Sequence, residues 1–148
     1  MKIKSEYRER IYKGEITMKK IMVLFDVEKI NEKSLEELKS RYSSNEAEVM
    51  LAAYDDDFFH YSLSNKGIKE YDERLERNFE AAEEILKNYK TERRIIANYL
   101  ADKEAERFVN EYDANEVIID CSSKRMNRLF NKLRKVKGYH ISALKAAA

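Results

Sequence analysis

The sequence predicts a three-layer α/β/α sandwich built around a mostly parallel, five-stranded β-sheet. Short apolar runs alternate with amphipathic segments along the chain, which is the pattern of β-α-β units. Proline is absent and only three of the 148 residues are glycine, so a turn-rich all-β fold is disfavoured. Charged residues make up 39% of the chain, which favours long helices with solvated faces.

The first β-α-β unit begins with the apolar run from Ile21 to Phe25, which ends in Asp26. A run without alternation indicates a strand that is covered on both faces. Apolar residues at helical spacing predict a helix over 31–42, and a second apolar strand follows at 49–54. That strand ends in the acidic residues 55–57. The two strands should be parallel and joined by a right-handed crossover.

The rest of the chain continues this alternation of strands and helices. The strongest helical pattern runs over 67–90, where apolar residues fall on one face. Further strands are predicted over 93–100, 116–120 and 139–144, and further helices over 102–112 and 124–136. Each added unit supplies one strand to the sheet and one helix to a face, so the whole pattern predicts a single α/β core.

The chain divides into one domain and two short flanking segments. Residues 18–145 are expected to form the α/β domain, because all the apolar runs fall there. Residues 1–17 are polar and weakly periodic, which is typical of an N-terminal extension. Residues 146–148 are three alanines that resemble an expression-vector remnant.

The chain is nearly neutral, with 29 basic and 28 acidic residues. There is therefore no bulk electrostatic reason for nucleic acid or an anionic membrane as a partner, and nucleic acid is not favoured. No apolar run approaches the roughly 20 residues needed to cross a bilayer. The lone Cys121 suits a reducing compartment. We expect a cytoplasmic protein that does not bind membranes.

Five aspartates follow predicted strands, namely Asp26, Asp55, Asp56, Asp57 and Asp120. The carboxyl ends of parallel strands share one edge of the sheet, where α/β folds bind ligands. Carboxylates gathered there could hold Mg²⁺ or Mn²⁺, and such an ion can activate water for phosphodiester cleavage. The stretch VLFDVEKIN also resembles the opening of NYN/PIN-like nucleases. The simpler interpretation is solvated carboxylates at loop ends, since aspartate is common after strands.

The helix predicted over 124–136 and its flanks are rich in basic residues: Lys124, Arg125, Arg128, Lys132, Arg134, Lys135 and Lys137. Such a face could contact the phosphates of a nucleic acid or a nucleotide. An ordinary solvated helix face is favoured instead, because acidic helices balance its charge and no aromatic residues are interleaved for stacking. Where this helix begins, Ser122, Ser123 and Lys124 offer hydroxyls, amides and one ammonium group to an anion.

Three phrases resemble the universal stress protein family: KKIMVLFDV, AEVMLAAYDDD and ANYLADKEAERFVNEYDANEVIID. The resemblance covers about residues 18–144. It implies the Rossmann-like fold of the adenine nucleotide alpha hydrolase-like group and a homodimer formed through the last strand. It also implies an ATP or AMP site between the end of the first strand and a Gly-x-x-Gly loop after the fourth. Asp26 falls where the family has an aspartate near the adenine and ribose.

The glycine-rich loop of that family is missing from this sequence. Asp120 and Ser123 stand at its two glycine positions, and Leu133 and Arg134 stand where Gly-Ser or Gly-Thr would follow. Glycines let backbone N–H groups approach a phosphate, whereas an aspartate repels it. We therefore expect a dimeric binding or regulatory domain without the family's usual ATP binding, without a bound metal and without catalytic turnover.

The residues expected to bind a ligand are Asp26, Ser122, Ser123 and Lys124, and no residue is assigned a catalytic or metal-binding role. Two alternatives stay open. One is a metal-dependent nuclease of NYN/PIN-like type that uses Asp26, Asp120 and one of the aspartates at 55–57. The other is a stress protein that binds ATP or AMP through a remodelled phosphate site.

Overall fold

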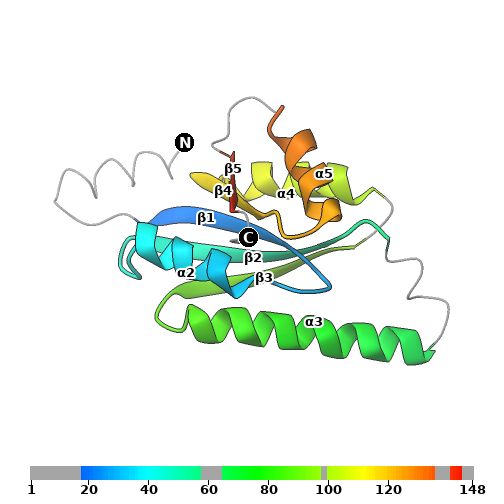
Figure 1. The fold of residues 1–148 in the computed structure, drawn as a ribbon. Coiled ribbons are helices and arrows are strands. Elements are labelled where there is room, and N and C mark those ends of the chain that lie inside the picture. The colour runs from blue at the N-terminus through cyan, green and yellow to red at the C-terminus, as the bar shows by residue number, and fades with distance from the viewer. Residues whose placement is uncertain (1–17, 58–64, 98–99, 136–140, 145–148) are drawn as a thin grey trace.

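A computed structural model describes residues 18–57, 65–97, 100–135 and 141–144. The extension expected over 1–17 and the alanines at 146–148 lie outside the described residues, so both stay predictions. Within the described ranges, strands and helices alternate as the sequence predicts (Figure 1). The α/β class and the parallel sheet are therefore confirmed.

The described elements have the following bounds. The strands are β1 Lys19–Asp26, β2 Ala47–Asp55, β3 Lys90–Ala97, β4 Glu116–Asp120 and β5 Ile141–Leu144. The helices are α2 Glu32–Arg41, α3 Asn65–Ile85, α4 Ala101–Tyr112 and α5 Lys124–Leu133. Within these ranges, no helix is both long enough and apolar enough to span a membrane.

The strands form one sheet in the order β3-β2-β1-β4-β5, and every neighbouring pair is parallel. The chain starts at the central strand β1 and moves outward through β2 to β3. It then returns to place β4 on the other side of β1. The connections that leave β1 and β4 therefore run in opposite directions, and this divergence opens a crevice at the carboxyl edge of the sheet.

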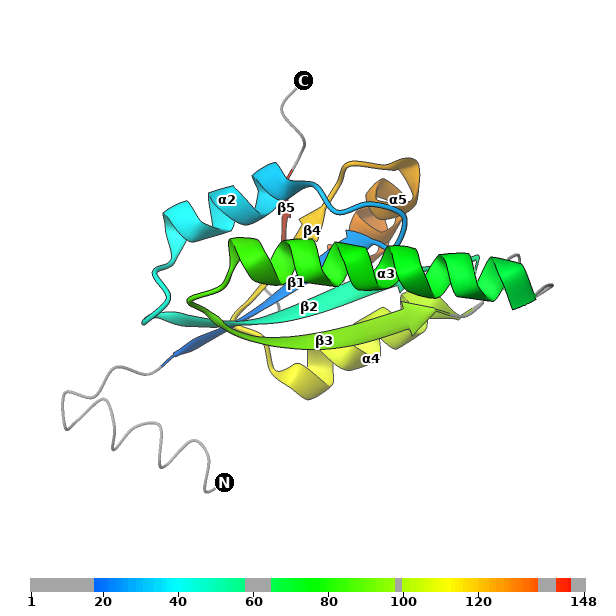
Figure 2. The same ribbon diagram turned by 90° about the horizontal axis from the view of Figure 1, so that it is seen from below.

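Two helices cover each face of the sheet, which gives the three predicted layers (Figures 1 and 2). Helices α2 and α3 share one core cluster with the sheet, and α4 and α5 share the other. Alternate residues of β1 show the division, because Val23 and Phe25 belong to the first core and Met22 and Leu24 to the second. A strand buried on both faces is apolar without alternation, as its sequence is.

The third strand begins earlier than the sequence predicts. We expected a strand over 93–100 after a helix that ends near residue 90, whereas α3 ends at Ile85 and β3 begins at Lys90. The reason is that β3 lies at an edge of the described sheet and exposes most of its side chains. Its polar first half therefore lacks the apolar run that marks the inner strands.

Candidate functional site

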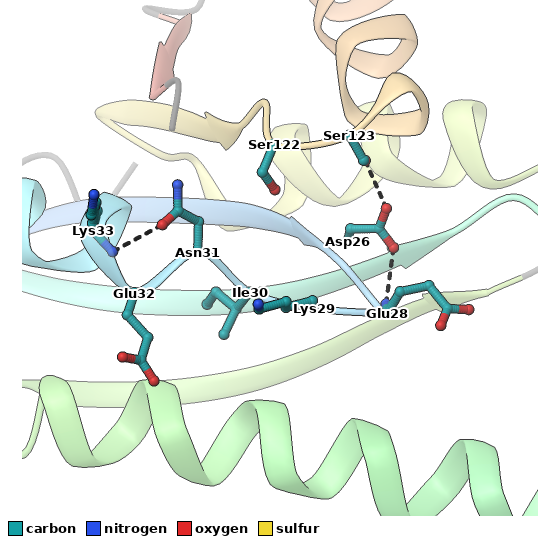
Figure 3. Close-up of a pocket in the computed structure, with 9 residues that line it drawn as sticks. All are labelled: Asp26, Glu28, Lys29, Ile30, Asn31, Glu32, Lys33, Ser122 and Ser123. Carbon is teal, nitrogen blue, oxygen red and sulfur yellow. Dashed lines mark hydrogen bonds between the residues drawn. The ribbon is translucent and has the colours of Figure 1, made fainter. Parts of the chain in front are cut away.

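A pocket of about 640 Å³ opens at the carboxyl edge of the sheet, where the connections after β1 and β4 diverge (Figure 3). One wall is the loop after β1 together with the start of α2, and another is the loop after β4. The lining residues are Asp26, Glu28, Lys29, Ile30, Asn31, Glu32, Lys33, Ser122 and Ser123. Open α/β sheets bind their ligands in crevices at this position, which makes the pocket the candidate site.

Asp26 closes β1 and has only 6% of its surface exposed. Its Oδ2 accepts a hydrogen bond from the Ser123 hydroxyl at 2.7 Å, and its Oδ1 accepts the backbone N–H of Glu28 at 2.9 Å (Figure 3). The Ser123 oxygen also accepts the N–H of Met126 at 3.3 Å and so caps α5. One serine thus joins the end of β1 to the start of α5.

The guanidinium of Arg125 lies among three carboxylates at the ends of β1 and β2. Its Nη1 is 3.0 Å from Asp26 Oδ1, its Nη2 is 3.3 Å from Asp55 Oδ1, and its Nε is 3.0 Å from Asp56 Oδ1. Burial opposes the charge of this side chain, yet the three carboxylates hold the pKa of Arg125 above its ordinary value. Arg125 therefore stays charged and neutralises much of this acidic edge.

Asp55 is the most enclosed of these three carboxylates, with no exposed surface. Burial raises the pKa of its carboxyl, because a charged group loses solvation in the protein interior. The backbone N–H of Asp57, at 2.8 Å from Oδ1, and the charge of Arg125 both reduce that rise in pKa. Both partners thus favour the ionised form of Asp55.

Asp120 closes β4 and is also fully buried. Its two oxygens accept the backbone N–H of Asn31 at 2.8 Å and the hydroxyl of Ser34 at 3.1 Å. Burial raises the pKa of Asp120, and the hydrogen bonds oppose that rise. Both donors belong to the start of α2, so Asp120 attaches this helix to the sheet and does not line the pocket.

Asn31 is a pocket residue that the sequence reasoning did not identify. Its Oδ1 accepts the N–H of Lys33 at 3.1 Å and so caps α2. Its Nδ2 is buried and has no hydrogen-bond partner among the described residues. A buried donor without an acceptor is unfavourable, so an acceptor that entered the pocket beside Asn31 would gain a contact there. The only signal in the sequence was the suitability of asparagine as a helix cap.

Three of the four expected ligand residues, Asp26, Ser122 and Ser123, line the pocket. Lys124 is exposed as the first residue of α5 and lies outside the lining set. The cationic side chains that do line the pocket are Lys29 and Lys33, which precede and begin α2.

The acidic strand ends come together as the sequence reasoning expected, but around a guanidinium. Asp26, Asp55 and Asp56 all contact Arg125. In the part of the chain that the structure describes, no group of three or more His, Cys, Asp or Glu residues is placed to hold a metal ion. Arg125 was grouped with the basic helix face in the sequence. The signal in the sequence that could have identified Arg125 is its place in the first turn of the helix that directly follows the carboxyl end of β4.

No family model and no curated protein matches the chain. Solved structures match its fold. Hypothetical protein MJ0577 superposes with a TM-score of 0.71 and 16% identity, over 89% of this chain and 99% of its own. The universal stress protein from Archaeoglobus fulgidus gives a TM-score of 0.50 and 15% identity, over 90% of this chain and 98% of its own. The chain has a universal stress protein fold.

A further neighbour, hypothetical protein PH0823, gives a TM-score of 0.51 and 16% identity, over 86% of this chain and 97% of its own. The structural match thus extends over almost the whole length of each of these neighbours. At the level of the fold, this match confirms the resemblance that the sequence shows to the universal stress protein family. Because one fold hosts many activities, the function has to be argued from the residues of the pocket.

Proposed function

We propose that the protein is a universal stress protein-like binding or regulatory domain that takes a small anionic ligand in the pocket between β1 and β4, without catalytic turnover. The main support is the position of this pocket of about 640 Å³ at the divergence of the chain connections. Two lysines and the starts of two helices at this pocket favour a ligand that carries an anionic group.

Hydrogen-bond donors and positive charge meet at the pocket. Lys29 and Lys33 line it, and the buried Nδ2 of Asn31 has no acceptor among the described residues. The helices α2 and α5 both start there, at their caps Asn31 and Ser123. The N-terminus of a helix carries a partial positive charge that favours an anionic group.

Acceptors in the same lining favour a ligand that also carries hydroxyl or amine groups. Glu28 and Glu32 line the pocket alongside the lysines. A bare inorganic anion would meet these carboxylates with repulsion, whereas a phosphate joined to a polar organic group can place its donors near them. AMP and ATP have this combination of groups and are the first ligands to test.

The mode of binding should differ from the family's usual one. The two glycine positions of the phosphate loop hold Asp120, which attaches α2 to the sheet, and Ser123, which binds Asp26. Arg125 covers the ends of β1 and β2 with its three ion pairs. A phosphate would therefore lie toward the start of α2 and not on a glycine loop.

The contacts of Asp26 give the nuclease alternative less support. A metal-dependent nuclease would need Asp26 as a ligand of the cation, but both of its oxygens already accept hydrogen bonds from Ser123, Arg125 and the N–H of Glu28. A divalent ion would have to displace the half-buried guanidinium of Arg125. The homodimer expected through the last predicted strand, residues 139–144, stays a prediction from the sequence.

Calorimetry and thermal unfolding with AMP, ATP and adenosine test the proposal. A ligand that binds only the folded state stabilises it by about 2.7 kcal/mol at a concentration one hundred times its Kd. We expect AMP or ATP to raise the melting temperature, and adenosine, which lacks a phosphate, to have little effect. Lys33→Glu should remove this stabilisation, because it places a negative charge in the pocket.

Lys39→Glu is the matched control, since Lys39 lies in the last turn of the same helix and is absent from the lining. Its response to AMP or ATP should equal that of the wild type. Equal responses of the Lys33 and Lys39 variants, or no response to any phosphate compound, would overturn the proposal. Metal-dependent cleavage of single-stranded RNA that Asp26→Asn abolishes would instead establish the nuclease alternative.

A further inference from the structure

Strand β3 is the longer of the two outer strands in the described sheet. β3 contains eight residues and pairs with β2 alone among the described strands, whereas β5 at the opposite edge contains four. Figure 2 shows β3 along the near edge of the sheet, between α3 and α4. An edge strand of this length presents backbone N–H and C=O groups that can pair with another chain.

A groove of about 400 Å³ follows this edge and brings apolar side chains together from three elements. Its lining residues are Asp72, Leu75, Glu76 and Phe79 of α3, Arg93, Arg94 and Ile95 of β3, and Phe108 of α4. Ile95 has 51% of its surface exposed, the largest value among the exposed large hydrophobic residues of the described chain. The edge thus combines pairing groups with apolar surface that a partner could bury.

The arginines of β3 point to opposite faces, as successive residues of a strand do. Arg93 lies against α3, where it contacts Glu76 at 2.8 Å and Glu83 at 2.9 Å and stacks over a phenylalanine ring. Its charge is therefore compensated within the subunit. Arg94 lies over the ring of Phe108 in α4, at 5.4 Å from the ring centre. Neither Arg94 nor its neighbour Glu92 forms an ion pair with another described residue.

We propose that this groove binds β3 of a second copy of the chain, in an antiparallel pair with its two-fold axis at Arg93. In an antiparallel pair, the N–H and C=O groups of two directly opposite residues either both point toward the other strand or both point away from it. The axis of a symmetric pair must therefore lie midway between one residue and the same residue of the second copy. With the axis at Arg93, Glu92 of each copy lies opposite Arg94 of the other.

The charges of β3 select this register over its neighbours. An axis at Arg94 would place two arginines without compensating carboxylates opposite each other, and an axis at Glu92 would do the same with two glutamates. Like charges that are directly opposite destabilise a strand pair. At Arg93 the same juxtaposition costs less, because Glu76 and Glu83 compensate each guanidinium. The Arg93 register is thus self-complementary.

This arrangement gives a closed dimer with one continuous sheet across both copies. Symmetric pairing at one edge closes, whereas symmetric pairing at both edges would extend the sheet without end. The dimer at β3 is therefore an alternative to the dimer expected from the sequence through the last strand, 139–144. The surface at β3 is separate from the ligand pocket, since no residue lines both cavities.

Charge reversal on the full chain tests the pairing and its register. Glu92→Arg and Arg94→Glu should each weaken dimerisation by about tenfold or more, because two attractive pairs become repulsive. The double variant Glu92→Arg/Arg94→Glu should dimerise like the wild type. The two single variants, once mixed, should form a heterodimer in preference to either homodimer. Sedimentation equilibrium at micromolar concentrations measures all four outcomes.

Glu73→Arg, an exposed change on α3 outside the groove, serves as the matched control and should leave dimerisation unchanged. Backbone hydrogen exchange over residues 90–97 gives a second measurement and should slow as the protein concentration rises through the dimer dissociation constant. A monomer at every concentration would overturn the proposal. So would a dimer that neither single charge reversal weakens, which would point to the opposite edge.

Discussion

The hydroxyl of Ser123 donates a hydrogen bond of 2.7 Å to Asp26, although the two residues are 97 positions apart in the sequence. The same oxygen accepts the N–H of Met126 and so begins α5. A single side chain therefore fixes the end of the central strand, one wall of the pocket and the first turn of a helix. These interactions should be lost together when the hydroxyl is removed.

We expect Ser123→Ala to lower the free energy of unfolding by about 1 to 2 kcal/mol, because it removes a helix cap and a hydrogen bond to a buried carboxylate. Ser123→Thr keeps the hydroxyl and should lose less. Ser40→Ala, which removes an exposed hydroxyl bonded within its own helix, should change stability by less than about 0.5 kcal/mol. Urea unfolding measures the three values. Similar losses for Ser123→Ala and Ser40→Ala would contradict the double role of Ser123.

Arg125→Met should be strongly destabilising, because it leaves Asp26 and Asp55 buried without their cation. Removing one partner of a buried ion pair costs about 3 to 5 kcal/mol. Arg128→Met is the matched control, since Arg128 is exposed and only its 3.5 Å contact with Asp56 would be lost. Urea unfolding at neutral pH compares the two variants.

The loss caused by Arg125→Met should also depend on pH. Without the guanidinium, the pKa of Asp55 should rise further above its ordinary value, because burial would be less opposed. Protonation then relieves the buried charge, so the variant should recover part of its lost stability as the pH falls. A loss that stays constant on acidification would mean that packing, and not charge, explains the effect.

Asp113→Gly should stabilise the protein. Asp113 ends α4 with φ 54° and ψ 48°, in the left-handed region where glycine has no steric penalty. The expected gain is about 0.5 to 1 kcal/mol in the free energy of unfolding. Asp72→Gly makes the same chemical change on an exposed face inside α3 and should instead destabilise by about 0.3 kcal/mol, since aspartate is only slightly better than glycine inside a helix. If Asp113→Gly instead lowered the free energy of unfolding, the Asp113 side chain would stabilise the protein by more than its left-handed backbone conformation destabilises it.

The sequence predicts those parts of the fold that depend on burial along the chain. The central strand is apolar from Ile21 to Phe25 because both of its faces are covered, and the structure buries every residue of that run. The start of β3 at Lys90 carries no such pattern, because an edge strand exposes side chains on both faces. Edge strands are held by backbone pairing to a neighbour, which the sequence does not display.

The candidate site was predictable in its position but not in its contacts. Strand ends locate Asp26 and Asp55 at one edge of a parallel sheet, whatever the details of packing. The reach of Arg125 across two strand ends depends on where α5 lies over the sheet, which is a tertiary property. The same holds for Asn31, whose backbone N–H binds Asp120 while its Nδ2 has no partner among the described residues.

Asp120→Asn should change how stability depends on pH while leaving the fold intact. Burial raises the folded-state pKa of Asp120 above its unfolded value of about 3.9, so the folded state binds more protons between these two values. Asp120 therefore adds stability as the pH falls through the folded pKa, and it opposes folding once it is ionised. Asparagine removes this contribution, yet its oxygen can still accept the Asn31 N–H and its amide can donate to Ser34.

We therefore expect Asp120→Asn to be near neutral or stabilising at pH 7 and to gain less stability than the wild type on acidification toward pH 4. Asp120→Ala, which leaves the Asn31 N–H without an acceptor, should lose about 1 to 3 kcal/mol. Urea unfolding over a pH series measures both variants, with Asp72→Asn on the exposed face of α3 as the matched control. If Asp120→Asn and Asp120→Ala were equally destabilising at pH 7, the ionised carboxylate would be required at the start of α2, against the raised pKa of Asp120.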